Sequence, residues 1–314
     1  ERTTLSIGFF AGSAHSMPWY VADQMGFFDA LNIDVEYQSF TGGPAMMEAN
    51  ADWDVCDVGA PGMLNGMKNY DINMIGICDN ELNTALFVRE DSDLAEKPDD
   101  PEAWRNKKVL LNKGTTLQYM FMQYMNSIGI TDLDEYGIQI IDTAVGTCLT
   151  AFQTGEGDAM AANPPYSYQL EEEGYTKLCS FEDATGVNMC DGCFVRNKVI
   201  AERSEEIQLF VDCLVKAMDD LQDDDLRSEY TRKVYDENAI SCSDSDLAHE
   251  IADRQYVGTE AMKQSDYVLG QAWVAITDFL VEAEKITAEN APNVAASINA
   301  EYVSKTVGTE IKSE

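Results

Sequence analysis

Short apolar runs alternate with polar, glycine-containing turns through the first two thirds of the chain. The first run is Leu5 to Phe10 and the second is Ile33 to Phe40, and each predicts a β-strand. A turn and then a helix follow each run. The first helix begins near Pro18, which suits a first turn, and Ser16 is its expected N-cap. Two strands that each deliver a helix N-terminus make a place where backbone N–H groups can meet a small ligand.

The alternation continues, which predicts an α/β sheet protein. Further strands are expected at residues 55–59, 74–78, 84–88, 109–112, 138–141, 158–161, 177–180 and 189–195. The helix after residues 113–116 has one apolar face, which is typical of core packing and consists of Leu117, Met120, Phe121, Tyr124, Met125 and Ile128. Residues 95–104 contain two prolines and several acids, and they indicate a surface connection.

From Ser204 onward the pattern is helical. Ser204 is the expected N-cap of a helix with Glu205 and Glu206 in its first turn. Its apolar stripe consists of Ile207, Phe210, Val211, Leu214, Val215, Met218 and Leu221. Further helices are expected over residues 244–262, 268–284 and 293–300.

Composition limits the partners of the protein. The chain has 314 residues, 45% of them hydrophobic, which is enough for two folded domains. Its 56 acidic residues against 21 lysines and arginines give a formal net charge of -35, which disfavours nucleic acid and anionic membranes as partners. No apolar run approaches the roughly 18 residues of a transmembrane helix. The chain starts at Glu1 with no Met and no signal sequence, which predicts a processed or trimmed mature form, although a cloning boundary would look the same.

Eight cysteines leave several readings open: structural bridges or buried thiols, inert free thiols, and metal or redox chemistry. Cys190 and Cys193 are the only close pair, and both histidines, His15 and His249, are distant in sequence, which disfavours a zinc site. A direct bridge between Cys190 and Cys193 would be strained on a strand. If the protein is exported, we expect longer-range bridges of unknown pairing.

Common catalytic motifs are absent. The chain has no Gly-x-Gly-x-x-Gly after a strand, no phosphate loop, no His-Glu-x-x-His and no Gly-x-Ser-x-Gly. With two histidines, acid–base chemistry would fall on carboxylates. We therefore expect no catalysis, no cofactor and no metal.

Several motifs resemble, in order and spacing, those of periplasmic substrate-binding proteins that serve ABC importers of sulfonates, taurine, nitrate and thiamine-type pyrimidines. The resemblance covers roughly residues 4 to 220. It is carried by Pro18-Trp19-Tyr20-Val21-Ala22, Gly26-Phe27-Phe28, Thr41-Gly42-Gly43, Asp57-Val58-Gly59 and Gly114-Thr115-Thr116. The most specific element is Ala151-Phe152-Gln153-Thr154-Gly155-Glu156-Gly157-Asp158-Ala159, followed by Asn163-Pro164-Pro165.

The resemblance implies a two-lobed type II periplasmic-binding-protein fold of the α/β class, with a hinge and a helical C-terminal region. Lobe 1 would comprise residues 1–88 plus 195–314, and the inserted lobe 2 would comprise residues 89–194. The strands at 84–88 and 189–195 would be the hinge crossings, and the lobes would close around a ligand in the cleft.

Ligand contacts are then expected in loops at the carboxyl ends of strands. In lobe 1 and at the hinge these residues are Ser13, Ala14, His15, Ser16, Trp19, Phe40, Thr41, Gly42, Gly43, Gly59, Ala60, Asp79, Asn80 and Asp191. In lobe 2 they are Lys113, Gly114, Thr115, Thr116, Gly146, Thr147, Asn163 and Tyr166. We expect one hydroxyl of Thr115 and Thr116 to cap the helix and the other to face the ligand.

The function implied is that of an extracytoplasmic solute-binding protein, periplasmic or lipid-anchored at the cell surface. It would be a monomer that delivers a small polar organic solute to a membrane permease. A sulfonate could lie at helix N-termini, and an amino-sulfonate such as taurine would also use Asp79 or Asp191. Four aromatic residues could stack on an aromatic ring or a cation: Trp19, Tyr20, Phe40 and Tyr166.

Two alternatives share the fold. One is a pyrimidine, amine or aromatic-acid binder. The other is an enzyme like those that build the thiamine pyrimidine, which carry a cysteine cluster on the strand where Cys190 and Cys193 lie. That chemistry also requires a cofactor lysine and an active histidine. A visible spectrum and iron analysis distinguish the enzyme from a binder.

Overall fold

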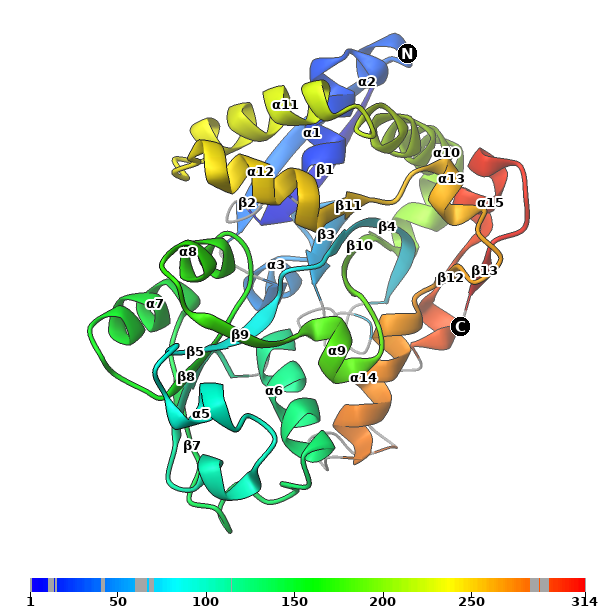
Figure 1. The fold of residues 1–314 in the computed structure, drawn as a ribbon. Helices are drawn as coiled ribbons and strands as arrows, with labels where there is room; N and C mark the ends of the chain where they lie inside the picture. The colour runs from blue at the N-terminus through cyan, green and yellow to red at the C-terminus, as the bar shows by residue number, and fades with distance from the viewer. Residues whose placement is uncertain are drawn as a thin grey trace. The chain divides into compact units, whose positions relative to one another are not determined.

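The computed structural model describes residues 2–10, 14, 16–40, 43–59, 67, 71–113, 115–282, 288 and 294–313. The architecture is mixed α/β, as expected (Figure 1). The chain divides into two compact units, each with its own sheet: unit 1 is Glu1–Asn80 with Cys190–Glu314, and unit 2 is Glu81–Met189.

Unit 1 is built on a six-stranded sheet. Its spatial order is β11 (Arg254–Tyr256), β4 (Ile72–Glu81), β10 (Met189–Arg196), β3 (Val55–Gly59), β1 (Thr3–Phe10) and β2 (Ile33–Phe40). Strand β1 is parallel to β2 and β3, and β10 is antiparallel to β3. The strands expected at residues 33–40 and 55–59 are confirmed with the same bounds. Because β1, β2 and β3 are parallel, their carboxyl ends lie at one edge.

Helices surround this sheet, and a two-stranded sheet of β12 (Val268–Leu269) and β13 (Lys312–Ser313) lies apart from it. The helices are α1 (Met17–Gln24), α2 (Phe27–Ala30), α3 (Gly43–Glu48), α10 (Asn197–Asp220), α11 (Asp224–Glu237), α12 (Asp244–Asp253), α13 (Thr259–Met262), α14 (Gln271–Glu282), η2 (Ala295–Ser297) and α15 (Glu301–Val307). Helix α1 packs against α10 and α11. Every residue of the predicted stripe on α10 is buried, which confirms it.

Three expectations for the helical region are wrong. Helix α10 begins at Asn197 and has a kink at Arg203, and the hydroxyl of Ser204 lies 2.9 Å from that of Tyr302 instead of capping a helix. The helix expected over 244–262 is interrupted by β11, because Arg254 and Tyr256 turn inward beside β4. In the range 293–300, the described residues form only the short η2.

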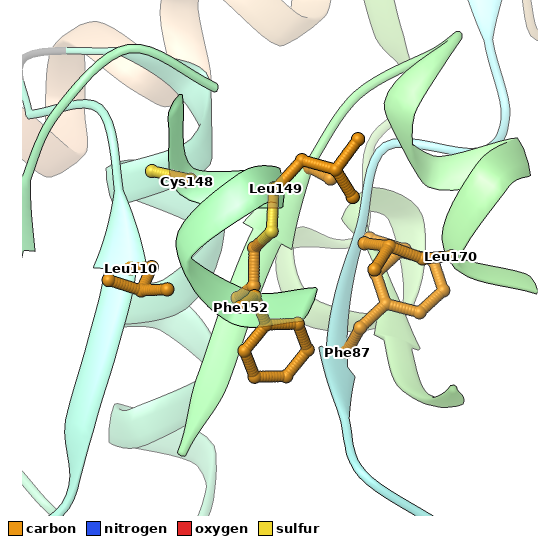
Figure 2. Close-up of a cluster of buried hydrophobic side chains, with 9 residues drawn as sticks. Phe87, Leu110, Cys148, Leu149, Phe152 and Leu170 are labelled. Carbon is orange, nitrogen blue, oxygen red and sulfur yellow. The ribbon is translucent and has the colours of Figure 1, made fainter. Parts of the chain in front are cut away.

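Unit 2 has a five-stranded sheet in the order β7 (Gln139–Asp142), β6 (Lys108–Leu111), β8 (Ala159–Ala162), β5 (Ala85–Val88) and β9 (Thr176–Ser180). Its helices are α5 (Asp93–Glu96), η1 (Pro101–Trp104), α6 (Thr116–Ser127), α7 (Val145–Gln153), α8 (Tyr166–Glu172) and α9 (Phe181–Thr185). The core cluster in Figure 2 joins Phe87, Leu110, Leu149, Phe152 and Leu170 from strands and helices of this unit. The apolar face of α6 is buried as expected, except that Ile128 is half-buried.

The two strands expected as hinge crossings, β5 and β10, each belong to the other unit from the one expected. Strand β5 was placed in lobe 1, but it pairs with β8 and β9 of unit 2. Strand β10 was placed in lobe 2, but it pairs with β3 of unit 1. A local apolar run shows that a strand is buried, but it does not show which sheet the strand joins. The connection at 95–104 also contains two short helices, and Trp104 in it is fully buried.

The most specific motif of the sequence has a structural role in unit 2. Gly155 and Gly157 both have positive φ, and a Cβ on Gly157 would lie 2.8 Å from Cγ of Leu110. The carboxylate of Asp158 accepts the N–H of Lys108 at 2.8 Å. Arg89 donates to the carbonyl of Gly157 at 2.7 Å. The motif therefore fixes the turn between α7 and β8.

Candidate functional site

Three parallel strands of unit 2 end at the same edge of its sheet. Strand β6 is parallel to both β7 and β8, so the segments that follow them lie side by side. Those segments contain all the predicted lobe 2 residues, of which Gly114 lies outside the described residues. The exposed side chains among them are Lys113 and Thr147, and Thr115, Asn163 and Tyr166 are half-buried. We call this set the unit 2 edge.

Hydrogen bonds hold the first two segments of the unit 2 edge together. The backbone N–H of Lys113 donates to Oδ1 of Asp142 at 2.9 Å. The side-chain amide of Asn112 lies 3.5 Å from the carbonyl of Thr143. These contacts leave the Lys113 ammonium group without a hydrogen bond to any residue that the structure describes, so its charge is available at the edge.

The expected threonine cap is wrong. Thr115 is the N-cap residue of α6, but its hydroxyl donates to the carbonyl of Asn112 at 2.7 Å and caps no N–H group. Thr116 is buried, with 8% exposure. The Thr115 hydroxyl is oriented toward the Asn112 carbonyl, and none of the first N–H groups of α6 donates to it.

Helix α7 begins at the same edge without a side-chain cap, because its N-cap is Ala144. The N–H groups of Val145 and Gly146 have no acceptor among the described residues. Tyr166 lies against this helix start: a Cβ on Gly146 would be 3.2 Å from the Tyr166 hydroxyl oxygen. Backbone donors, a tyrosine hydroxyl and Lys113 therefore come together at one sheet edge.

In unit 1, Ser16 and Asp57 link α1 to β3. Ser16 is the N-cap residue of α1, but its hydroxyl donates to Oδ2 of Asp57 at 2.7 Å, so the expected cap is wrong. Asp57 is fully buried. The start of α1 uses backbone acceptors instead: Met17 N–H donates to the carbonyl of Ala14 and Trp19 N–H to that of Ser16. The Ser16 hydroxyl provides a hydrogen bond that the buried carboxylate needs.

Asp79 does not act as a free carboxylate for a ligand amine. It is fully buried and forms an ion pair with Arg254, which also donates from Nε to Oε2 of Glu250 at 2.7 Å. Tyr235 donates to the other oxygen of Glu250. Asp79 therefore belongs to a buried charge network, and its role in ligand binding stays a prediction.

The expected site residues do not include Arg254, Glu250 or Arg227, although all three are buried. Arg227 also contacts this buried charge network, because its guanidinium group donates to the backbone carbonyl of Glu250 at 2.9 Å. Glu250 and Arg254 are four residues apart, a spacing that marks a helical ion pair. That spacing was visible in the sequence, but it gives no sign of burial.

The remaining predicted residues of unit 1 differ in their surroundings. Trp19 is fully buried, packs edge-on against Phe210 at 5.6 Å and donates to Sγ of Cys78 at 3.4 Å. Together with Ser16 it lines a pocket of unit 1, and its stacking on a ligand stays a prediction. Ala14 is buried, and its carbonyl accepts the Tyr256 hydroxyl at 2.9 Å. Phe40 and Gly59 are the last residues of β2 and β3, and Gly43 is the first residue of α3. Asn80 lies near the end of β4, and Asp191 lies near the start of β10. Ser13, His15, Thr41, Gly42 and Ala60 lie outside the described residues.

All eight cysteines are free thiols, so the expected disulfides are not formed. Cys190 and Cys193 are three residues apart on β10 and therefore face opposite sides of the sheet. Burial and then a hydrogen bond with Cys193 raise the pKa of Cys78. A disulfide between Cys190 and Cys193 would be strained, as predicted, because the two side chains leave opposite faces of the strand.

With these features in place, comparison with known proteins gives a family. Residues 1–234 match the NMT1-like family. The chain belongs to the NMT1-like family. A relative from Brachyspira hyodysenteriae is named as a candidate ABC transporter periplasmic binding protein; it is 22% identical over 278 residues, which are 84% of this chain and 78% of the relative.

Solved structures show that this NMT1-like protein has the periplasmic-binding-protein fold. The aliphatic sulphonate binding protein SsuA from Escherichia coli has a TM-score of 0.74 at 17% identity and covers 95% of this chain and 92% of its own. SsuA from Xanthomonas axonopodis pv. citri, bound to MOPS, has a TM-score of 0.71 at 15% identity, with 96% and 99% covered. The desulfurization enzyme DSZB has a TM-score of 0.65 at 12% identity, with 98% and 99% covered. The fold therefore occurs in binding proteins and in an enzyme.

None of the described helices combines the length and the apolar character that a membrane-crossing helix needs.

Proposed function

We propose that this protein is the extracytoplasmic solute-binding component of an ABC importer and that it captures a small organic solute with an anionic group, such as a sulfonate or an amino-sulfonate. The observation that carries the proposal is membership of the NMT1-like family over residues 1–234. The Brachyspira relative and the two SsuA structures support it, because their names describe periplasmic binding and sulfonate binding.

The unit 2 edge supplies the chemistry for an anionic group. The N–H groups of Val145 and Gly146 lie at the positive end of α7, and Lys113 adds a full positive charge on the neighbouring segment. Tyr166 offers a hydroxyl beside Gly146. Sulfonate oxygens accept hydrogen bonds from all of these donors, and three such oxygens match a site with several separate donors.

Recognition of a ligand amine needs a group other than Asp79, because Arg254 neutralises that carboxylate. The proposal therefore places the anionic group of the solute at the unit 2 edge and leaves Asp79 out. As a binder that delivers its solute to a membrane permease, the protein would catalyse no reaction and would act as a monomer.

A thermal-shift screen of sulfonates, amino-sulfonates and small carboxylates tests the proposal. A ligand at 100 times its dissociation constant should stabilise the protein by about 2.7 kcal/mol. Lys113→Gln should weaken binding of a sulfonate by roughly tenfold, as expected for the loss of one charged donor worth about 1.4 kcal/mol. Lys108→Gln is the matched control: it makes the same charge change at the opposite end of β6, and it should leave binding unchanged.

Three results would contradict the proposal. If none of these anions stabilises the protein, the solute class is wrong. If a bound solute is converted to a product by the purified protein, the protein is an enzyme like DSZB and not a binder. Equal loss of binding in Lys113→Gln and Lys108→Gln would show that net charge, and not the unit 2 edge, controls binding.

A further inference from the structure

A pocket of about 380 Å³ lies within unit 1, and the proposed anion site does not include it. Its wall comes from β1, β2, α1 and the C-terminal end of α11. Its volume is sufficient for a small organic ligand. The side chains that give it chemical character are Phe9, Tyr20, Asp23, Tyr37 and Glu237. Of these, only Tyr20 is expected from the sequence to stack on a ligand ring or cation, and the predicted Ser16 and Trp19 also line the pocket.

Two tyrosines hold the two carboxylates of the pocket. The Tyr20 hydroxyl donates to Oε1 of Glu237 at 2.7 Å, and the Tyr37 hydroxyl donates to Oδ2 of Asp23 at 3.3 Å. Burial, followed by interactions that include both carboxylates, raises the pKa of each tyrosine, so these four groups are neighbours. The second oxygen of each carboxylate accepts no hydrogen bond from the residues that the structure describes.

No lysine or arginine is among the residues that line the pocket in the described part of the chain. The ammonium group of Lys233, on the same helix as Glu237, lies 2.5 Å from Glu229 and 4.6 Å from the ring centre of Tyr230. Burial raises the pKa of Asp23, and the Tyr37 hydrogen bond partly opposes that rise. Glu237 is exposed, so a cation in the pocket would offset the desolvation of the Asp23 carboxylate and gain a charge contact with Glu237.

Aromatic rings form the other part of the wall. Phe9 and Tyr37 meet edge to face at 5.9 Å between ring centres, and Tyr20 packs against Tyr230 at 6.1 Å. Aromatic rings attract ammonium ions and also cover their hydrocarbon groups. Tyr37 is 39% exposed, so the pocket is accessible from solvent.

We propose that this pocket binds a small substituted ammonium ion, with its charge at Asp23 and Glu237 and its hydrocarbon groups against Phe9, Tyr20 and Tyr37. The inference rests on unit 1 alone. It is independent of the anion site proposed for unit 2, and each can fail without the other.

Isothermal titration with choline, tetramethylammonium and butylammonium tests this proposal on the full chain. The neutral control ligand is 3,3-dimethylbutan-1-ol, which has the shape of choline without its charge. At least one ammonium ion should bind, and for choline the neutral isostere should bind about tenfold more weakly or worse. Lys113→Gln should leave ammonium binding unchanged, which separates this site from the unit 2 edge.

Isosteric variants locate the site. Glu237→Gln and Asp23→Asn should each weaken ammonium binding by roughly tenfold. Asp236→Asn is the matched control, because Asp236 is the exposed neighbour of Glu237 on α11 and does not line the pocket. Circular dichroism checks that each variant is folded, and Asp23→Asn provides the test if Glu237→Gln is not.

The proposal is overturned if none of the three ammonium ions binds at millimolar concentration. It is also overturned if choline and its neutral isostere bind equally well, since the carboxylates then contribute nothing. Equal weakening in Asp236→Asn and Glu237→Gln would show that the ions respond only to the net charge of the protein.

Discussion

Replacement of Arg254 by methionine should strongly destabilise unit 1. Arg254 is 1% exposed and is the cation that pairs with both Asp79 and Glu250, which are 0% and 2% exposed. Its removal leaves two buried carboxylates without their counter-ion. Breaking a buried ion pair by removing one partner costs about 3–5 kcal/mol.

The expected change in melting temperature follows from the size of unit 1. For a unit of roughly 200 residues, 1 kcal/mol corresponds to about 2–4 °C, so Arg254→Met should lower the melting temperature by roughly 6–20 °C. Thermal unfolding followed by circular dichroism measures this. The control is Arg232→Met, which breaks an exposed ion pair with Asp244 and should cost less than about 1 kcal/mol.

A triple variant separates charge from packing. Asp79→Asn, Glu250→Gln and Arg254→Met together remove all three charges, so the triple variant should be more stable than Arg254→Met alone. The reasoning is refuted if Arg254→Met costs no more than Arg232→Met. It is equally refuted if the triple variant is no more stable than the single one, because the loss would then come from packing.

Three more predictions concern a turn, a helix cap and the thiols. In urea unfolding, Gly157→Ala should destabilise the protein more than Gly155→Ala. Both glycines have positive φ, but only a Cβ on Gly157 would contact buried Leu110, and this overpacking adds about 1–3 kcal/mol to the cost. The backbone N–H and then the hydroxyl of Ser180 lower the pKa of Asp183, so its ionised form stabilises the protein at neutral pH. The stability advantage over Asp183→Asn should therefore shrink as pH falls below 3.8 through the lowered pKa, and a constant difference would contradict this. In a thiol assay without reductant, the unfolded protein should show eight thiols and the native protein only slow reaction at Cys242, the one cysteine that is not buried; fewer thiols on unfolding would mean disulfides.

Local pattern was sufficient for most of the fold. The strands at 33–40 and 55–59 and the stripe on α10 follow from apolar spacing alone, because that spacing records which face of an element is buried. The family resemblance, with the rule that ligands bind at the carboxyl ends of strands, predicts Lys113, Gly146 and Tyr166 as contacts of one ligand. Strand β6 lies between β7 and β8 and is parallel to both, so the three carboxyl ends meet at one edge of the sheet.

Strand pairing was not available from the sequence. Strand β5 reads as a buried strand, but its partners β8 and β9 come from residues far along the chain. Strand β11 was read as part of a helix, since three residues are too few to show a period of two. In both cases the tertiary partner, and not the local pattern, decides the structure.

The sequence determined an α/β protein with polar turns at the ends of its strands, because helix and strand periods are local properties. Only the tertiary structure decided which charges of those turns are free. Asp79 looks like a ligand-binding carboxylate until folding brings Arg254, 175 residues away, against it. Asp23 and Glu237 look like ordinary surface acids until α1 and α11 place them in one aromatic pocket. The free energy of a charged group depends on its burial and on its partner, and the fold supplies both.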